Sequence, residues 1–381
     1  MMQLPLHGLV VLEFSQYLSG PSAGLRLADL GARVIKIERP GKGDAGRKLA
    51  IKELWVDDNS LLFHTINRNK ESFTADLKNA EELALVKKLV AKADVVMHNF
   101  RPGVMEKTGL GYEPLQAINP RLIYAVISGY GTKGPWMKKP GQDLLLQSMT
   151  GLSYTTGSGN NGPVPFGVAI ADILCGSQLV QGILAALIRR QKKGIGALIE
   201  ISLLESMLDF QFELLTTYYT NHQQPLRSKI NNGHPLLSAP YGIYQTADGY
   251  LALAMMDLQV LADAIHCKGL NHFQQEQAFA QRDSIKEILA AYLLTQKTNY
   301  WLDLLQQQGL WAMEVMDWED MLAHEAYQVL EMEQVIQAGD RKIVTTRCPI
   351  RINGQKLYAK RPAPQLGEHN ASITRDFSLA H

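Results

Sequence analysis

An aspartate between a loop and a long helix is the residue of this chain best placed for covalent chemistry. Asp172 follows the apolar run VPFGVAIA and directly precedes ILCGSQLVQGILAALIRRQKK, whose apolar positions recur at helical spacing. A carboxylate at this junction is stabilised by the positive pole of the helix and shielded from bulk water, as a carboxylate nucleophile requires. The pattern therefore indicates nucleophilic carboxylate chemistry at Asp172.

The same position also fits a purely structural role. Aspartate is one of the preferred N-cap residues, and a carboxylate before an apolar helix often does no more than accept a hydrogen bond from an unpaired amide. The predicted helix ends in a cluster of cations followed by Gly194, as expected where a helix stops. The residues by themselves leave both capping and catalysis open for Asp172.

The elements that must position this aspartate alternate between strands and helices. A strand over 9–14, a helix over 22–30 and a strand over 34–37 predict one βαβ unit over residues 8–39. The alternation continues with a helix over 80–92, a strand over 94–97, a helix over 112–118 and strands over 122–127 and 197–201. It predicts an α/β fold with a mostly parallel sheet that is covered on both faces.

Polar segments follow the first four predicted strands, at residues 16–20, 38–39, 99–101 and 128–131. Ligands of open α/β sheets bind outside the carboxyl ends of the strands, so these segments should meet in one crevice. Arg39 and Arg101 bring positive charge there, and the glycines expose backbone amides, which suits a phosphorylated ligand. The alternative that both arginines are solvated surface charges stays open.

A dinucleotide site is a weaker interpretation of the same βαβ unit. An acidic residue follows the second strand, but the loop SQYLSGPSAG lacks the G-x-G-x-x-G spacing of that fold. A nicotinamide-dependent oxidoreductase is therefore the least favoured of the enzyme hypotheses.

The composition excludes several other classes of protein. The chain has 381 residues, of which 46% are hydrophobic, and a formal net charge of +1, so it has no overall basic field for nucleic acid. No apolar run reaches membrane-spanning length, and the N-terminal residues lack the features of a signal peptide, so we expect no membrane partner and a cytoplasmic location. The three cysteines, Cys175, Cys267 and Cys348, are scattered, which argues against disulfides and against a metal site.

The second half of the chain predicts a separate region. A helix from Leu203 to about Asn221 is followed by the polar stretch NHQQPLRSKINNGHP, and then by a β-hairpin with its turn at Asp248 and Gly249. A further strand is expected over residues 342–346.

Several strings along the chain resemble the class III CoA-transferases of the CaiB/BaiF type. This family includes the formyl-CoA:oxalate, acetyl-CoA:oxalate and carnitine CoA-transferases, with the α-methylacyl-CoA racemases as a divergent branch. The strings follow the family's order: GLVVLEFSQYLSGP, GARVIKIERPGKGDAGR, NRNKESFTADLK, ADVVMHNFRPGVMEKTGLGYEPLQAINPRLIYAVISGYG, TTGSGNNGPVPFGVAIAD, GHPLLSAPYGIYQTADG and RPAPQLGEH.

The resemblance implies an architecture. It implies a large Rossmann-like domain built from both chain ends, over residues 1–222 and 335–381, with a smaller α+β domain inserted over 223–334. The strand over 342–346 would then return to the first sheet. An interlocked homodimer is implied as well.

The resemblance also implies the chemistry. The family's nucleophile matches Asp172, which would attack an acyl-CoA thioester and form first a mixed anhydride and then an aspartyl-CoA thioester. The substrates would be acyl-CoA and a small carboxylic acid, with no permanently bound cofactor. The CoA-binding positions carried over by motif are Tyr17, Leu18, Ser19, Arg39, Ala75, Lys78, Asn99, Phe100, Arg101, Lys107, Ser128, Gly129, Tyr130 and Gly131, with Arg39 and Lys107 expected to bind the phosphates.

Two further functions stay open. The racemases use a histidine within G-H-D as a base, whereas this chain has Gly141, Gln142 and Asp143, and glutamine cannot act as a base at neutral pH. Asp143 is expected to cap the helix after it, while Asp257 and His234 keep a catalytic role open. The third possibility is a noncatalytic CoA-binding protein.

Overall fold

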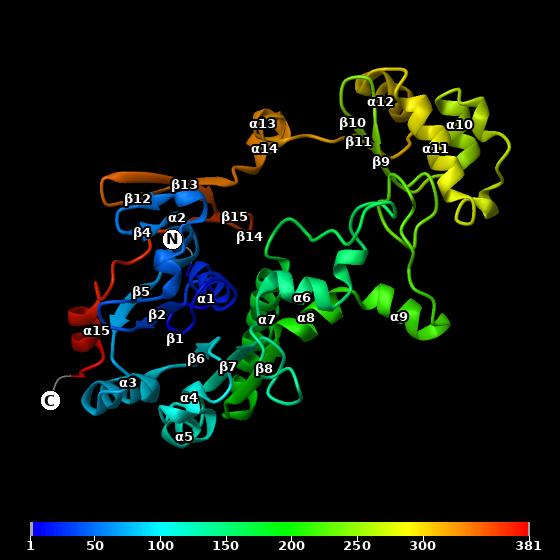
Figure 1. Ribbon diagram of the computed structural model, residues 1–381. Coiled ribbons are helices and arrows are strands. Elements are labelled where there is room, and N and C mark those ends of the chain that lie inside the picture. The colour runs from blue at the N-terminus through cyan, green and yellow to red at the C-terminus, as the bar shows by residue number, and fades with distance from the viewer. Residues whose placement is uncertain (1–2, 380–381) are drawn as a thin grey trace. The chain divides into compact units, whose positions relative to one another are not determined.

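The structure is a computed structural model that describes residues 3–379. The chain forms two compact units (Figure 1). Unit 1 contains residues 1–146, 169–207 and 330–381, and unit 2 contains residues 147–168 and 208–329. Both chain ends therefore belong to unit 1. Relative to the expected division, residues 147–168 and 208–222 group with unit 2, and residues 330–334 group with unit 1.

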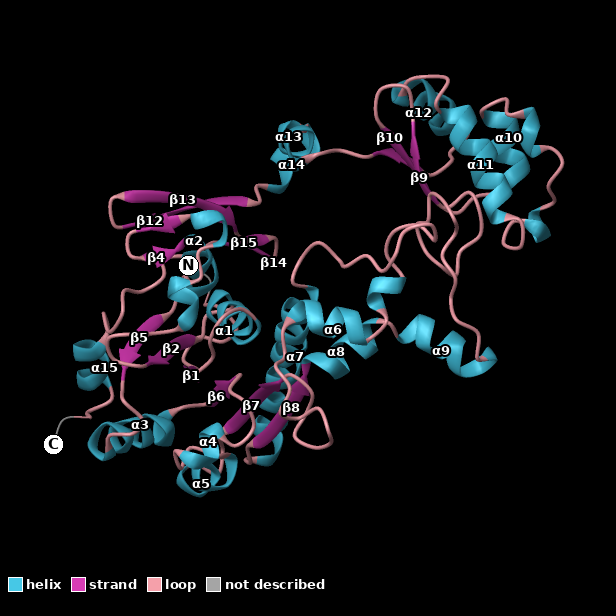
Figure 2. Ribbon diagram, in the orientation of Figure 1, coloured by secondary structure: helices cyan, strands magenta, loops and turns pink. Residues whose placement is uncertain are grey.

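A six-stranded parallel sheet forms the centre of unit 1 (Figure 2). Its order is β5-β2-β1-β6-β7-β8, the order of the doubly wound sheets that bind dinucleotides. The predicted α/β, Rossmann-like fold is thereby confirmed. The strands are β1 Val10–Glu13, β2 Arg33–Glu38, β5 Glu71–Thr74, β6 Val95–His98, β7 Ile123–Ser128 and β8 Ala197–Ser202.

Helices cover both faces of this sheet. On one face, apolar side chains of the strands pack in one buried cluster with α3 Ala80–Lys92, α4 Val104–Lys107, α5 Tyr112–Ile118 and α15 Asn370–Asp376. On the other face, α1 Ser19–Asp29 contacts β1 and β2, and α7 Ile170–Lys193 contacts β7 and β8. Because both faces are covered, the strands can be apolar on both sides, as their sequences are.

The two helices of the second face approach each other closely. A Cβ atom on Gly176 of α7 would lie 2.6 Å from the carbonyl oxygen of Ser19, so only glycine allows this approach. At the other end of α7, Gly194 adopts a left-handed conformation with φ of 74° and stops the helix, as predicted. The contact fixes the start of α1 against the first turns of α7.

The C-terminal segment completes unit 1 but does not enter the large sheet. The predicted strand over 342–346 forms as β13 Arg341–Thr346, which pairs only with β12 Glu333–Ala338 among the described strands. Its expected return to the first sheet was therefore wrong. Instead α15 docks on the edge strand β5, where Asn370 Oδ1 accepts a hydrogen bond from the amide of Thr74 at 2.9 Å.

Short elements complete unit 1. The described ones are α2 Leu61–Asn67, the strand pairs β3 Trp55–Val56 with β4 Asn59–Ser60 and β14 Cys348–Ile352 with β15 Gln355–Leu357, and the 3-10 turns Ala45–Lys48 and Ile51–Glu53.

Unit 2 has its own core. The predicted hairpin forms from β9 Gly242–Gln245 and β10 Tyr250–Leu253, and β11 Ala312–Glu314 adds a third antiparallel strand. Buried Tyr244 and Trp301 are the largest side chains of a cluster between this sheet and its helices. The helices of unit 2 are α9 Phe212–Asn221, α10 Leu258–Ala264, α11 Arg282–Leu293, α12 Thr298–Gln307 and α13 Trp318–Ala323, with 3-10 turns at Leu152–Tyr154, Lys268–Leu270 and Gln275–Gln277; α6 Asp143–Met149, α8 Leu203–Phe210 and α14 Glu325–Leu330 span the boundaries.

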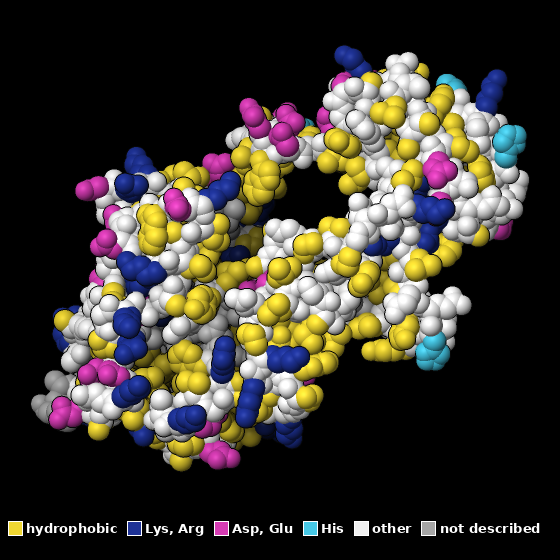
Figure 3. Space-filling view, in the orientation of Figure 1, with side chains coloured by type: hydrophobic (Ala, Val, Ile, Leu, Met, Phe, Trp, Pro, Cys, Tyr) yellow, Lys and Arg dark blue, Asp and Glu magenta, His cyan; other side chains and the backbone are white. Residues whose placement is uncertain are grey.

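Helix α7 and the three cysteines bear on two expectations from the sequence. The helix α7 is long and apolar enough to cross a membrane by composition, contrary to the expectation from the sequence, but it packs on α1, β7 and β8 as a core helix does. The three cysteines are all free and buried. On the visible face of unit 1, basic and acidic side chains are interspersed (Figure 3).

Candidate active site

The carboxyl ends of the central strands of unit 1 meet where the strand order reverses. Strands β1 and β6 are neighbours in the sheet although they are far apart in the sequence. Beyond them, the Asn99 side chain joins the two loops: its Oδ1 accepts a hydrogen bond from the Gln16 amide at 2.8 Å, and its Nδ2 donates to the Gln16 carbonyl at 2.7 Å. A reversal point of this kind is where doubly wound sheets bind their ligands.

A pocket of about 210 Å³ opens at these strand ends. Its lining comes from the ends of β1, β2 and β5 and from the loop after β6, and it includes Arg39, Ala75, Lys78 and Phe100, all of which the sequence predicted for CoA. Arg39 and Lys78 are exposed and bring positive charge to the pocket. Asp76 lines the pocket as well, so the two exposed cations offer local contacts for phosphate groups rather than a uniformly positive surface.

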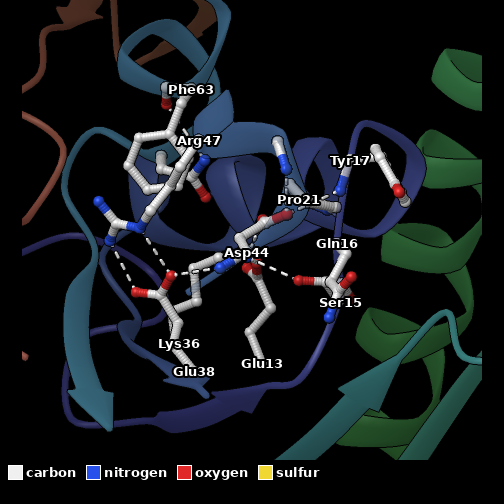
Figure 4. Close-up of polar contacts among 12 residues, drawn as sticks. Glu13, Ser15, Gln16, Tyr17, Pro21, Lys36, Glu38, Asp44, Arg47 and Phe63 are labelled. Carbon is white, nitrogen blue, oxygen red and sulfur yellow. Dashed lines mark hydrogen bonds and ion pairs between the residues drawn. The ribbon is translucent and has the colours of Figure 1, made fainter. Parts of the chain in front are cut away.

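Three residues that line this pocket, Lys36, Glu38 and Asp44, belong to a buried charge network (Figure 4). Lys36 Nζ lies 2.9 Å from Glu13 Oε1 and 2.7 Å from Asp44 Oδ2, and it donates to the Ser15 carbonyl at 2.7 Å. Burial by itself would lower the pKa of Lys36, but the Asp44 and Glu13 carboxylates outweigh it and raise that pKa. Asp44 Oδ1 also accepts from the Tyr17 amide at 3.1 Å, so the network fixes the loop after β1.

The network continues on both sides. Lys70 Nζ lies 2.8 Å from Glu13 Oε2, and burial lowers the pKa of this lysine to about 8. Arg47 pairs with Glu38 at 2.7 Å, and its guanidinium carbon lies 3.9 Å from the centre of the Phe63 ring. These contacts tie the loop after β2 to the sheet.

Asp172 lies in the first turn of α7 and is half-buried. The Ser19 hydroxyl at the start of α1 interacts with this carboxylate and lowers its pKa, and Asn99 Nδ2 lies 3.4 Å from the same hydroxyl oxygen. Burial raises the pKa of Asp172 to about 6, the charge of Asp143 adds to that rise, and the Ser19 hydrogen bond opposes it. Asp172 is thus connected through Ser19 to the loops at the strand ends.

The N-terminus of α7 is capped by a different residue. The N-cap position is Ala169, whose side chain cannot accept a hydrogen bond, and Asp143 Oδ1 instead accepts from the Ala171 amide at 2.7 Å. The interpretation of Asp172 as the N-cap is therefore wrong. Asp143, expected to cap the helix that follows it, is the first residue of α6 and bonds to the start of α7.

The sequence model of the family described as CoA-transferase family III matches residues 6–370. The chain belongs to CoA-transferase family III. It is 34% identical to the succinate–glutarate CoA-transferase of Agrobacterium fabrum over 97% of this chain and 94% of the relative. It is 33% identical to the acetyl-CoA:oxalate CoA-transferase of Acetobacter aceti over 98% of this chain and 96% of the relative. These matches confirm an enzyme of the CoA-transferase class.

The fold agrees with that of a solved family member. The crystal structure of a CaiB/BaiF family protein from Brucella suis superimposes with a TM-score of 0.85 at 33% identity, and the match covers 99% of this chain and 100% of that one. CoA-transferases use CoA thioesters as substrates, so this enzyme must bind a CoA thioester.

The other residues predicted for this family III enzyme's site lie at several positions around the strand ends. Tyr17, in a left-handed conformation with φ of 65°, and Leu18, the N-cap residue of α1, belong to the loop after β1. Arg101 follows β6 and Lys107 ends α4, and neither lines the pocket. Ser128, Gly129, Tyr130 and Gly131 form the turn after β7, where Ser128 Oγ accepts from the Gly131 amide at 2.9 Å.

Sequence reasoning missed the residues that support the pocket. Lys36 and Asp44 were not singled out, although a lysine inside the apolar strand RVIKIE is an unusual position for a charge. The sequence did not indicate a role for Asp44, which lies in a polar loop, because its contact with Lys36 becomes apparent only in the folded chain. Asp143 was noticed, but its contact with α7 depends on tertiary structure.

Two open candidates in unit 2 have structural contacts. Asp257 is the N-cap of α10, with its Oδ1 accepting from the Gln259 and Val260 amides at 2.8 and 3.0 Å. His234 Nδ1 accepts from the Leu236 amide at 3.2 Å. Unit 2 also contains an apolar pocket of about 590 Å³ beside β10 and β11. Among residues 3–379, no group of three or more His, Cys, Asp and Glu side chains could hold a metal ion.

The raised pKa of Asp172 predicts how this residue affects folding. Its folded-state pKa of about 6 lies above the ordinary value of 3.8, so ionisation of Asp172 costs stability as the pH rises through about 6. Asp172→Asn, which keeps an acceptor for Ser19, is expected to raise the free energy of unfolding at about pH 8 by about 1–2 kcal/mol, and to change it little below about pH 4. Urea denaturation at both pH values measures this. A variant less stable than the wild type at the higher pH contradicts it.

Proposed function

We propose that this family III enzyme transfers CoA from an acyl-CoA thioester to a free carboxylic acid, with Asp172 as the covalent nucleophile. The observation that carries the proposal is the position of the Asp172 carboxylate together with its raised pKa. The carboxylate lies half-buried at the positive end of α7, burial raises its pKa to about 6, and the Asp143 carboxylate accepts a hydrogen bond from the neighbouring Ala171 amide. Its attack on a thioester is thereby favoured.

The proposed reaction consists of two matched halves. The Asp172 carboxylate attacks the carbonyl carbon of the acyl-CoA, the carbon–sulphur bond breaks, and a mixed anhydride and the CoA thiolate form. The thiolate then attacks the aspartyl carbonyl, releases the donor acid and leaves an aspartyl-CoA thioester. The acceptor carboxylate attacks this thioester, and the released thiolate attacks the acceptor's carbonyl in the new anhydride, which frees Asp172 and forms the new acyl-CoA.

Each of these attacks produces an oxyanion next to the start of a helix. The positive pole of α7 and those of its first amides that Asp143 does not occupy favour negative charge at this position, so they would stabilise the tetrahedral intermediates without a dedicated side chain. No proton has to be taken from the nucleophile, because a carboxylate attacks in its ionised form. The chemistry therefore needs no histidine base at Gln142, which is exposed just before α6.

The phosphorylated end of CoA is proposed to bind in the pocket at the strand ends. Arg39 and Lys78 supply its positive charge. The apolar surface for the adenine base of CoA comes from Phe14, Ile37 and Phe100. Among the two residues expected from the sequence to bind phosphates, Arg39 lines this pocket and Lys107 does not. We therefore assign the main phosphate contact to Arg39.

Removal of Arg39 should weaken binding more than turnover. Arg39→Ala is expected to raise the KM for acyl-CoA by about 10-fold and to change kcat by less than about threefold, because the phosphates bind equally in the ground and transition states. Initial rates at varied acyl-CoA measure both parameters. Lys42→Ala removes a cation from the same loop that does not line the pocket and serves as the control. Equal losses in kcat and kcat/KM contradict the assignment.

The acids are proposed to be small, with dicarboxylates first. The relatives named above are a succinate–glutarate and an acetyl-CoA:oxalate CoA-transferase. A panel of acyl-CoA donors, including succinyl-CoA and acetyl-CoA, should therefore be tested against a panel of carboxylates, with new acyl-CoA measured by mass spectrometry. Incubation with donor and hydroxylamine should convert Asp172 to a hydroxamate. Transfer without any such adduct at Asp172 argues against the mechanism.

A second function is an acyl-CoA racemase of the same family. It requires exchange of the α-hydrogen, which should appear as deuterium uptake in heavy water without an acceptor acid. We expect none, because Gln142 replaces the histidine base. A noncatalytic CoA-binding protein would instead bind CoA and show neither reaction.

We also propose that the enzyme is a homodimer. Large apolar side chains are exposed on unit 2, among them Trp311 at 70% and Met313 at 65%, and buried partner surface would explain them. Light scattering after size exclusion decides between this and a monomer.

A further inference from the structure

Two carboxylates are found at the start of α7: Asp172 of α7 itself and Asp143, the first residue of α6. Asp143 Oδ1 accepts from the Ala171 amide at 2.7 Å and so satisfies an amide that the helix cannot satisfy itself. The N-cap residue Ala169 has no side-chain acceptor. Without Asp143, the nearest carboxylate to these amides on α7 itself would be Asp172, in the same first turn.

A carboxylate that caps its own helix is a poor nucleophile. Hydrogen bonds from amides stabilise its charge, lower its basicity and direct its lone pairs to the helix. In the structure, the group of α1 that interacts with the Asp172 carboxylate is the Ser19 hydroxyl, and Asn99 Nδ2 lies 3.4 Å from the oxygen of that hydroxyl. Asp143 thus leaves Asp172 directed to those loops.

We propose that Asp143 is a positioning residue for the nucleophile: its carboxylate caps α7 in place of Asp172, and its charge keeps the Asp172 carboxylate basic enough to attack a thioester. The inference rests on the proposed nucleophilic role of Asp172. It adds a residue that touches neither CoA nor acid and acts through the end of a helix.

The charges around Asp172 support the second half of this proposal. Among the described residues, Asp143 is the ionisable group whose charge acts on Asp172, and it adds to the effect of burial that raises the pKa of Asp172 to about 6. From α1 the group that faces Asp172 is the neutral Ser19 hydroxyl. One turn along α7, burial raises the pKa of the Cys175 thiol to about 12, so Cys175 is neutral, and Glu205 of α8 acts on Cys175.

The test separates the cap from the charge. Asp143→Asn keeps an acceptor at the same reach from the Ala171 amide and Asp143→Ser keeps a shorter one, and both remove the charge, whereas Asp143→Ala removes acceptor and charge. In the first two, the midpoint of the acid limb of kcat/KM should move about one pH unit lower. Transfer at about pH 8 should fall several-fold, because a less basic carboxylate attacks more slowly. Asp143→Ala should lose more activity than either.

Asp317→Asn is the matched control. Asp317 caps α13 in unit 2, with its Oδ1 accepting from the Asp320 amide at 3.0 Å, so this change also exchanges a capping carboxylate for a neutral acceptor. Its pH profile should equal that of the wild type. An unshifted acid limb in Asp143→Asn overturns the proposal. Failure of both Asp143→Asn and Asp143→Ser to fold overturns it too, because a neutral cap should be sufficient for the helix.

A direct titration of Asp172 distinguishes failure of the inference about Asp143 from failure of the proposed function. In protein labelled with carbon-13 at the aspartate carboxyls, Asp172→Asn identifies the Asp172 signal by its loss, and its titration is then followed in Asp143→Asn. A lower titration midpoint supports the inference even if Asp172→Asn keeps full transfer activity, a result that would reject only the nucleophile. An unchanged midpoint rejects the inference even if Asp172 proves to be the nucleophile.

Discussion

Replacement of Asp172 by alanine is expected to lower the rate of CoA transfer by about 10⁴- to 10⁶-fold, the loss typical when a covalent nucleophile is removed. Asp172→Asn should be equally inactive, because an amide keeps the shape of the side chain but cannot attack a thioester. Binding of CoA should stay within about threefold of the wild type in both variants, since the proposed phosphate contacts lie in the pocket at the strand ends.

The pH dependence gives the same prediction a second measurement. Only the ionised carboxylate is a nucleophile, and burial raises the pKa of Asp172 to about 6, so kcat/KM should fall as the pH decreases through about 6. The profile is measured with a monocarboxylic acceptor, which titrates near the ordinary range of carboxyl groups of about 4 and so well below that value. The acid limb therefore reports Asp172 rather than the acceptor acid.

Asp257→Asn is the control for this experiment. Asp257 caps α10 with its carboxylate, and asparagine caps helices about as well, so transfer should be unchanged. Calorimetric titration with CoA and a single-turnover assay, in which the hydroxylamine adduct is measured, separate binding from chemistry. If Asp172→Ala transfers CoA at a rate comparable to that of the wild type, the nucleophile lies elsewhere; if Asp257→Asn is inactive, unit 2 contributes to catalysis.

The sequence predicted the regular parts of unit 1 because local patterns determine them. The helices over 80–92 and 112–118 have the predicted bounds, since their apolar residues recur at helical spacing and polar residues precede them. The edge strand β5, Glu71–Thr74, was missed because its sequence ESFT is half polar; it forms because β2 and the C-terminal segment pair and pack with it. Tertiary contacts decided that element.

The site shows the same limit. Asp172 could be found because a motif and a helix start coincide at it, but the residue that caps α7 could not be identified. Aspartates before apolar helices are common caps, and only the fold reveals that Asp143, 28 residues away, reaches the Ala171 amide. The expected return of the strand over 342–346 to the large sheet failed for a related reason. Its alternation of exposed and buried residues suits the two-stranded sheet with β12 equally well.

Replacement of Lys36, a buried lysine that lines the pocket, is expected to lower the free energy of unfolding substantially. Lys36 is the shared partner of Glu13 and Asp44, and all three side chains are at most 1% exposed. Lys36→Met fills a similar volume but leaves two carboxylates in a dry interior, with Lys70 as the remaining cation next to Glu13. Removal of one partner from a buried ionic group typically costs about 3–5 kcal/mol, and we expect a loss of this size in the free energy of unfolding.

Loss of Lys36 should also affect the loop after β1, because Lys36 holds the Ser15 carbonyl and orients Asp44, which accepts from the Tyr17 amide. CoA transfer should therefore fall more than the remaining folded fraction explains. Urea denaturation measures the first effect and initial rates the second. The control Lys48→Met removes an exposed lysine of the neighbouring turn and should cost less than about 0.5 kcal/mol. Adding Glu13→Gln and Asp44→Asn to Lys36→Met should recover part of the stability, because the unpaired charges are then gone. A cost below about 1 kcal/mol for Lys36→Met would show that water reaches these carboxylates and that the network does not support the pocket.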